Sequence, residues 1–263
     1  MRCYCRMIAL IKLLTFTVAS LVASGVAQQI PASSFLARAQ GAVSGGTAIQ
    51  DAVLLGKVRR VAGSEDLAGT ASLKATALGE MRLEMNFPSG PQSVVRTSTR
   101  TGLTGFWSGA DGQEHAVPFQ ALKTDDAQWF FPGIMLARLS QMPGVALAET
   151  LEKRHGSATE HLHIVQAADS RLPPYAVKLV EHADQIELFL DPITLLPTTV
   201  TFNTHPVHDL RRDVPVELRF SNYRSVNGAL VPFRVQEYLN RTLVLDLEFE
   251  TAQLNTGITV NAH

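Results

Sequence analysis

Residues 214–255 read VPVELRFSNYRSVNGALVPFRVQEYLNRTLVLDLEFETAQLN and decide the fold class of this chain. Apolar and polar side chains alternate along three segments of the stretch, which is typical of strands with one buried face. Asn227-Gly228, between the first two segments, is among the strongest short signals for a two-residue hairpin turn. A slip of one residue would move every charge of these segments into the core, so their register is strongly fixed. The stretch therefore predicts three long antiparallel strands.

The same two-residue alternation recurs more weakly upstream. The strands predicted there are residues 50–62, 69–78, 81–87, 92–101, 103–108, 115–119, 145–154, 159–168, 185–191 and 196–203. We expect a meander of about eleven strands, and thirteen at most, with one apolar face throughout. Because a single sheet of this width must curl, the predicted fold is mainly β: an open, unclosed antiparallel barrel with covering helices.

Two segments have helical rather than strand periodicity. Ser33 or Ser34 can cap a short helix that ends at Gly45-Gly46. The second segment, residues 126–142, is apolar on most sides, and Pro132 fits the first turn of its regular part. We expect this second helix to cover the inner face of the sheet. Residues 173–183 fit either a short helix or a loop.

The first 27 residues have the pattern of a cleavable signal peptide. Arg2 and Arg6 precede an apolar stretch that ends in the small residues 23–27. The stretch is shorter than the ~20 residues of a membrane-spanning helix, and no apolar stretch of that length follows. An uncut N-terminal anchor is the alternative interpretation. We expect a single domain over residues 28–263, with no transmembrane helix in the mature chain, that is periplasmic or secreted.

Cysteine content and charge exclude several classes of protein. Cys3 and Cys5 both precede the apolar stretch, so the mature chain would have no disulfide, no cysteine metal site and no cysteine nucleophile. Neither occupies the position of an acylated lipoprotein cysteine, which would follow that stretch. The net charge is −1, and removal of residues 1–27 takes three basic residues and no acidic one, which leaves −4. This balance does not fit a nucleic-acid-binding protein.

Four motifs in the C-terminal third are shared with a known group of proteins. They are DPITLLP at 191–197, FSNYRSVNG at 220–228, VPF at 231–233 and LNTGI at 254–258. In these motifs the chain resembles the outer-membrane lipoprotein-sorting proteins, the LolA/LolB-like group, over roughly residues 185–258.

This resemblance implies an unclosed β-barrel wrapped over helices, with an apolar cavity that holds acyl chains. The carriers of the group move lipoproteins or related lipids across the periplasm and use no cofactor. The region around Trp107 and residues 129–131 departs from the pattern of the true carriers, so the resemblance is that of a divergent member.

No catalytic motif accompanies these patterns. The chain has no Gly-x-Ser-x-Gly elbow and no glycine-rich phosphate loop. The adjacent carboxylates Asp125-Asp126 fit a helix N-terminus better than an acid–base pair. We therefore expect no enzymatic activity and no cofactor.

His161 and His163 are the strongest candidates for metal ligands. In a strand they would share one face, about 7 Å apart. A metal site would need a third ligand from elsewhere, such as His155, His205 or His208. Leu162 and Ile164 take the buried face, which places both histidines on the solvated face, and we predict no metal site.

The aromatic residues of the central region either fill the core or line a cavity. Binding of an acyl chain needs no motif, because burial of each methylene contributes ~0.8 kcal/mol. The residues that we expect to line an apolar cavity are Leu83, Met85, Trp107, Trp129, Phe131, Met135, Phe202, Leu218, Phe233 and Leu245.

Two hypotheses for the function remain. In the first, the protein is carrier-like and holds lipid or lipoprotein acyl chains between the concave sheet and the helix within residues 129–142. In the second, it is a non-catalytic accessory protein of the cell envelope, with the same fold and a filled core, that acts through surface contacts. An apolar cavity larger than a packing void would distinguish the first from the second.

Overall fold

The computed structural model describes most of the chain from Ala32 onward. The described residues are 32–99, 102–118, 122, 129–141, 145–166, 173–206, 209 and 211–260. The elements are α1 (Ala32–Ser44), β1 (Asp51–Ala62), β2 (Glu65–Thr76), β3 (Met81–Phe87), β4 (Gly90–Thr99), β5 (Gly102–Ser108), β6 (Glu114–Ala116), α3 (Pro132–Leu139), β7 (Val145–Arg154), β8 (Ser157–Gln166), α4 (Pro174–Ala183), β9 (Ile186–Leu190), β10 (Pro197–Thr204), β11 (Val214–Val226), β12 (Ala229–Leu239) and β13 (Thr242–Leu254). The predicted signal peptide lies outside the described residues, as do Phe119, Met142 and His208.

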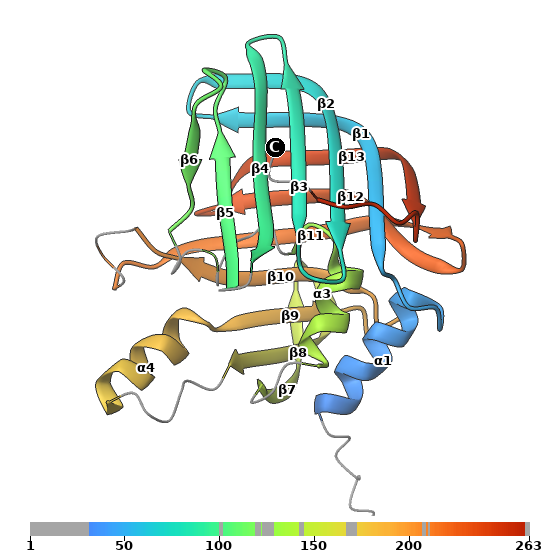
Figure 1. Ribbon diagram of the computed structural model, residues 1–263. Helices are drawn as coiled ribbons and strands as arrows, with labels where there is room; N and C mark the ends of the chain where they lie inside the picture. Colours follow the sequence, from blue (N-terminus) through green and yellow to red (C-terminus); the bar gives the residue numbers. More distant parts are fainter. Residues whose placement is uncertain are drawn as a thin grey trace, which may run out of the picture.

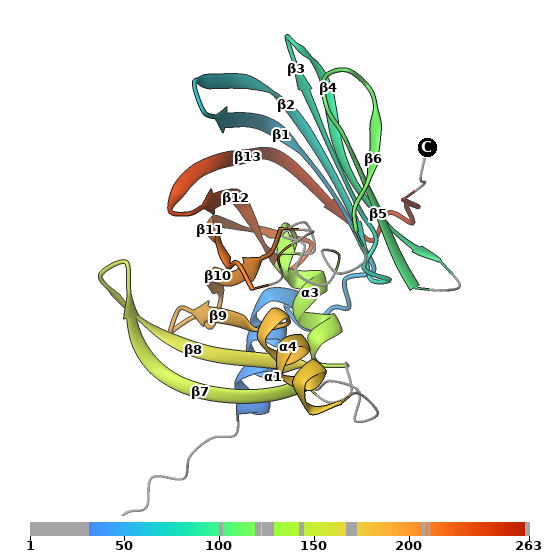
Figure 2. The ribbon, with the colours of Figure 1, turned by 90° about the vertical axis from the view of Figure 1, so that its left-hand side faces the viewer.

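All the described strands form one antiparallel sheet in the order β6-β5-β4-β3-β2-β1-β13-β12-β11-β10-β9-β8-β7. β1 pairs with β13, so the first and last strands lie side by side at the centre of the sheet (Figure 1). The edge strands of the described sheet, β6 and β7, do not pair with each other, and the curled sheet stays open (Figure 2). The predicted open antiparallel fold is confirmed, with thirteen strands rather than about eleven.

The C-terminal meander follows its sequence pattern closely. β11 ends at Val226 and β12 begins at Ala229, so Asn227-Gly228 forms the predicted turn. Both turn residues have positive φ, 50° and 87°, as a type I′ hairpin turn requires. Charged residues lie on the face opposite the core, where Arg234 of β12 binds Asp246 of β13 through two hydrogen bonds.

The core lies on the concave face, between the sheet and two helices. Along β11 the buried residues Val216, Leu218 and Phe220 alternate with partly exposed ones, and other strands repeat this pattern. α1 and α3 contact each other against this face, and Figure 2 shows α3 between the two walls of the curled sheet. The apolar side of each helix is therefore buried against the sheet.

α1 confirms the predicted N-terminal helix. Its buried residues recur at helical spacing and are Phe35, Leu36, Ala39 and Val43. At its C-terminal end Gly45 has φ +59° and approaches the β11–β12 turn so closely that a Cβ would lie 2.0 Å from the carbonyl oxygen of Gly228. Only glycine fits this position without displacement of the turn, so the helix ends against the hairpin that organises the meander.

α3 begins at Pro132, as its sequence suggested, and ends at Leu139. Most of its residues are buried, and Arg138 is the one charged residue in it. Trp129, Phe130 and Phe131 precede the helix rather than extend it, and all three are buried. The described part of the predicted helical segment therefore consists of three buried aromatic residues followed by a short helix.

Several boundaries differ from the prediction. β2 begins at Glu65, four residues before the expected start, because the β1–β2 turn is only Gly63-Ser64. β6 is a short three-residue strand. Residues 174–183, ambiguous in the sequence, form α4, whose described side chains are all at least partly exposed.

A buried carboxylate ties the chain end to the beginning of the sheet. Asp51 accepts hydrogen bonds from the backbone N–H groups of Thr256 and Gly257 and from the Thr256 hydroxyl. Burial alone would raise the pKa of Asp51, but these three donors outweigh it and lower the pKa from its ordinary value. The segment after β13 is thereby fixed across the start of β1. Within the described residues, no helix has the length and apolar character needed to cross a membrane.

Candidate functional site

A largely apolar cavity of about 620 Å³ opens at one end of the curled sheet. We call it the mouth cavity. One wall comes from β3, β4 and β5, the opposite wall from the β12–β13 hairpin, and the β1–β2 turn closes one side. Its lining residues are Arg60, Val61, Ala62, Gly63, Leu83, Met85, Gln92, Ser93, Val94, Trp107, Ser108, Phe130, Glu237, Leu239, Thr242, Val244 and Leu245.

Strand register builds the first wall. Leu83 of β3 lies opposite Val94 of β4, and Val94 lies opposite Trp107 of β5. Side chains that face each other across antiparallel strands lie on the same face and contact one another. The three residues therefore form one continuous apolar row across the wall, which we call the wall row.

Trp107 ends the wall row at the solvent side. The residue is 46% exposed, which is unusual for tryptophan, and its ring stacks on that of His115 with 4.2 Å between the ring centroids. Phe130 lies deeper and is almost fully buried. The cavity thus runs from an exposed aromatic residue to a buried one.

Polar groups gather at the rim. The Arg60 guanidinium donates a hydrogen bond of 2.7 Å to the side-chain oxygen of Gln92. Glu237 lines the opposite side. An apolar cavity with a few polar groups at its opening suits an amphipathic ligand.

Four of the ten residues expected to line a cavity do line the mouth cavity: Leu83, Met85, Trp107 and Leu245. Trp129, Phe131 and Met135 are buried at α3, where only a small space of about 20 Å³ adjoins Phe131 and Met135. Phe202 borders a different, polar pocket, and Leu218 and Phe233 belong to the packed core. Contact of any of the ten with a ligand stays a prediction.

The space beneath α3 is filled, and the helix is tied to the sheet by its one charged residue. The Arg138 guanidinium lies over Gly79 in the β2–β3 turn, so closely that a Cβ on this glycine would be 2.4 Å from Arg138 Cζ. Arg138 Nη1 is 3.5 Å from the carbonyl oxygen of Ala77, and burial lowers the pKa of Arg138. These contacts hold α3 against the β2–β3 turn.

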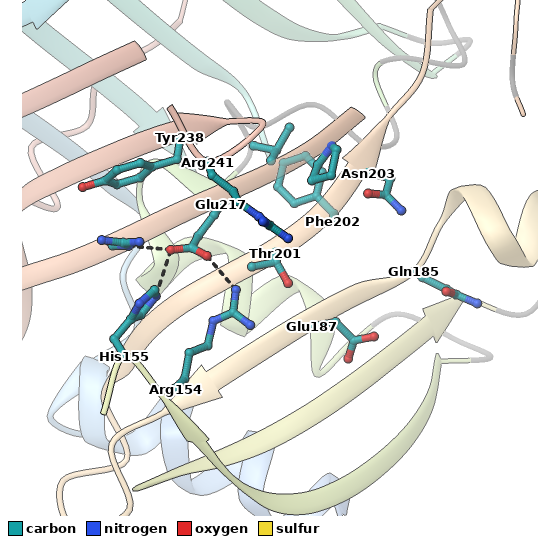
Figure 3. A pocket seen from close by; sticks show the side chains of 13 residues that line it. Arg154, His155, Gln185, Glu187, Thr201, Phe202, Asn203, Glu217, Tyr238 and Arg241 are labelled. Carbon is teal, nitrogen blue, oxygen red and sulfur yellow. Dashed lines mark hydrogen bonds and ion pairs between the residues drawn. The ribbon is translucent and has the colours of Figure 1, made fainter. Parts of the chain in front are cut away.

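A second pocket, of about 480 Å³, is lined mostly by polar and charged residues (Figure 3). At its centre Glu217 of β11 binds Arg154 at 2.6 Å, His155 at 2.9 Å and the neighbouring Arg219. Burial alone would raise the pKa of Glu217, but hydrogen bonds from Arg219 and Arg154 lower it. This ion-pair network joins the β7–β8 hairpin to β11. A lining that includes five charged residues suits an acyl chain poorly.

The two candidate metal ligands of β8 lie opposite the core, since Leu162 and Ile164 are buried as predicted. His161 Nε2 and His163 Nδ1 each contact a different oxygen of Glu187, at 2.6 Å. The expectation that both are solvated is wrong for His161. Its side chain is only 14% exposed because its ring stacks on Phe189, with 4.5 Å between centroids.

His155 and His205, the two described candidates for a third ligand, make other contacts. His155 contacts Glu217 instead. His205 lies with His182 and Asp213 in a separate cluster.

Solved structures resemble this chain in fold, whereas sequence comparison finds no relative. No family model and no curated protein matches the sequence. Several solved structures superpose on most of the chain. A protein domain assigned to outer-membrane lipoprotein sorting, from Vibrio parahaemolyticus, is 11% identical and covers 87% of this chain and 95% of its own, with a TM-score of 0.53. The chain has the LolA-like fold.

Two further structures agree with this assignment. A LolA superfamily protein from Nitrosomonas europaea is 13% identical, with 86% and 94% of the two chains covered and a TM-score of 0.52. A DUF1329 family protein from Desulfovibrio piger is 11% identical, with 87% and 95% covered and a TM-score of 0.52. The predicted resemblance to LolA/LolB-like proteins is confirmed at the level of the fold.

Several lining residues of the mouth cavity were not expected from the sequence. They are Val94, Phe130, Leu239 and Val244, together with the polar residues of the rim. Val94 carried a usable signal, because alternation predicted its strand and the register places it between Leu83 and Trp107. Phe130 carried no such signal, because the sequence Trp129-Phe130-Phe131 does not indicate which of the three aromatic rings faces the cavity.

Proposed function

We propose that this protein is an exported, carrier-like protein that binds a lipid or lipoprotein acyl chain in the mouth cavity. The observation that carries the proposal is the cavity itself: about 620 Å³, with the wall row, Phe130 and Leu245 as its apolar lining. This volume lies within the ~300–1,000 Å³ typical of ligand pockets. The LolA-like fold supports the proposal without specifying the ligand.

Apolar burial supplies the driving force. Each buried methylene contributes ~0.8 kcal/mol, so ten methylenes in the cavity would contribute about 8 kcal/mol before the costs of ordering the chain. The polar end of the ligand would remain at the rim. There Arg60 is suited to a phosphate or carboxylate oxygen, since its guanidinium already donates to an oxygen of Gln92.

The proposal includes no catalysis, no cofactor and no nucleic acid. It places the protein in the periplasm or outside the cell, on the grounds of the signal-peptide pattern of residues 1–27.

The second hypothesis, an envelope accessory protein that acts through its surface, draws on a different observation. Trp129, Phe131 and Met135 are buried beneath the sheet, and the space around them is filled. A filled interior is what this hypothesis requires. It leaves the mouth cavity without a role.

Native mass spectrometry of protein purified without detergent distinguishes the two. Under the carrier proposal we expect a bound species of lipid mass that denaturation releases, and a rise in the melting temperature when acyl lipid is added back. A lipid-free spectrum, together with a melting temperature that no acyl lipid changes, would rule out the carrier proposal and leave the accessory role.

A further inference from the structure

Two histidines and one aspartate converge at the end of α4, and none of the three lines either pocket. His182 lies in the last turn of α4, His205 directly follows β10, and Asp213 directly precedes β11. The Nε2 atoms of both histidines are 3.1 Å from the same atom, Asp213 Oδ1. This is the only group of three potential ligands within 4.8 Å of one another in the described part of the chain.

The donor set matches a first-row divalent metal. Imidazole nitrogen suits zinc, copper, iron and nickel, and two histidines with one carboxylate are a recurring ligand set. Zinc binds nitrogen and oxygen at ~2.0–2.2 Å, which puts tetrahedral ligands about 3.3 Å apart. The two Nε2–Oδ1 distances of 3.1 Å are close to this spacing, and all three ligand atoms lie within 4.8 Å of one another, so side-chain movements would admit an ion.

The cluster is both fixed and accessible. The His205 side chain is only 4% exposed, which limits its movement, whereas His182 and Asp213 are 44% and 41% exposed. In neutral imidazoles the proton can move from Nε2 to Nδ1, which frees both Nε2 lone pairs for a metal.

The position of α4 gives the ion a structural role. Figure 1 shows α4 at the periphery, beside β9 and β10. None of its described side chains is fully buried, so packing alone holds it weakly. Through His182, α4 contacts Asp213, the residue directly before β11.

We propose that His182, His205 and Asp213 bind a zinc-type divalent ion that clamps α4 to the connection between β10 and β11. With three protein ligands, the ion keeps a position for water or an added ligand. The site is independent of the mouth cavity, so the lipid-binding proposal and this one stand or fall separately.

The test uses the full chain, purified without a histidine tag, treated with EDTA and titrated calorimetrically with Zn²⁺ alone. We expect one saturable site. His182→Gln and Asp213→Asn should each weaken it at least as much as the ~10–100-fold that loss of a second-shell partner costs. Co²⁺ should give a visible d–d spectrum in the unmodified protein and not in either variant.

His163→Gln is the matched control, since it removes a histidine–carboxylate contact of the other cluster, and it should leave Zn²⁺ affinity unchanged. Circular dichroism in EDTA checks that each variant is folded. Zn²⁺ should also slow tryptic cleavage after Lys178, an exposed residue of α4. The proposal is overturned if no saturable site exists, if Asp213→Asn binds Zn²⁺ as the unmodified protein does, if only His163→Gln loses binding, or if bound Zn²⁺ gives no protection at Lys178.

Discussion

Replacement of Phe249 by aspartate is expected to unfold the protein. Phe249 is almost fully buried in β13, opposite Gly56 of β1, where the first and last strands join the two halves of the sheet. The strands are so close there that a Cβ on Gly56 would lie 2.5 Å from the Phe249 Cα. A carboxylate at this point has no partner and no access to water. Its burial would cost several kcal/mol, a large part of the ~5–15 kcal/mol that stabilises a typical domain.

Circular dichroism melting measures this effect. Phe249→Leu keeps an apolar side chain and should remain folded with a modest loss of stability, on the order of 1–2 kcal/mol. Glu248→Ala, on the exposed neighbouring residue, should melt close to the unmodified protein. A cooperative melt of Phe249→Asp within a few degrees of the unmodified protein would show that β13 does not present this residue to the core.

Val94→Asp is expected to abolish acyl-chain binding while the fold persists. Val94 is the centre of the wall row, between Leu83 and Trp107, but it is only partly buried, so an aspartate there can reach water at the mouth. With a chain in the cavity the carboxylate would be desolvated. We expect the dissociation constant of a fluorescent fatty acid to rise at least ~10-fold, which corresponds to about 1.4 kcal/mol.

Thr70→Asp provides the matched control. Thr70 is exposed on β2, opposite the exposed Asn86 of β3, and does not line the mouth cavity. Thr70→Asp introduces the same charge on the outer face of the sheet and should leave the affinity for the fluorescent fatty acid unchanged. Equal affinity in Val94→Asp and the unmodified protein would place the ligand somewhere other than the mouth cavity.

The fold was predictable where the turn residues and the alternation of apolar and polar residues indicate the same strand boundaries. β3 and β7 begin and end where the sequence predicted, and so does the turn at Asn227-Gly228. The start of β2 was predicted late because Glu65 and Asp66 are polar and resemble turn residues. In the structure Asp66 accepts two hydrogen bonds, of 2.7 and 2.8 Å, from the Arg59 side chain of β1, which compensates the weak strand propensity of aspartate.

The site was less predictable, because alternation tells which face a side chain lies on but not which part of a curled sheet faces which other part. Leu83, Leu218 and Phe233 all lie on the concave face, yet only Leu83 borders the mouth cavity. Contacts such as His182 with Asp213 join residues 31 positions apart, and no local pattern reports them.

Contact between a bound acyl chain and Trp107 is the most direct test of the central claim. The chain has two tryptophans, Trp107 at the mouth and Trp129 fully buried near α3. Titration with a fatty acid brominated near its middle should quench the Trp107 emission saturably. The dissociation constant from this quenching should equal the one found when the brominated acid displaces the fluorescent fatty acid. Trp107→Phe should lose most of the quenching. Saturable binding of the brominated acid without quenching in the unmodified protein, or equal quenching in Trp107→Phe, would contradict the account.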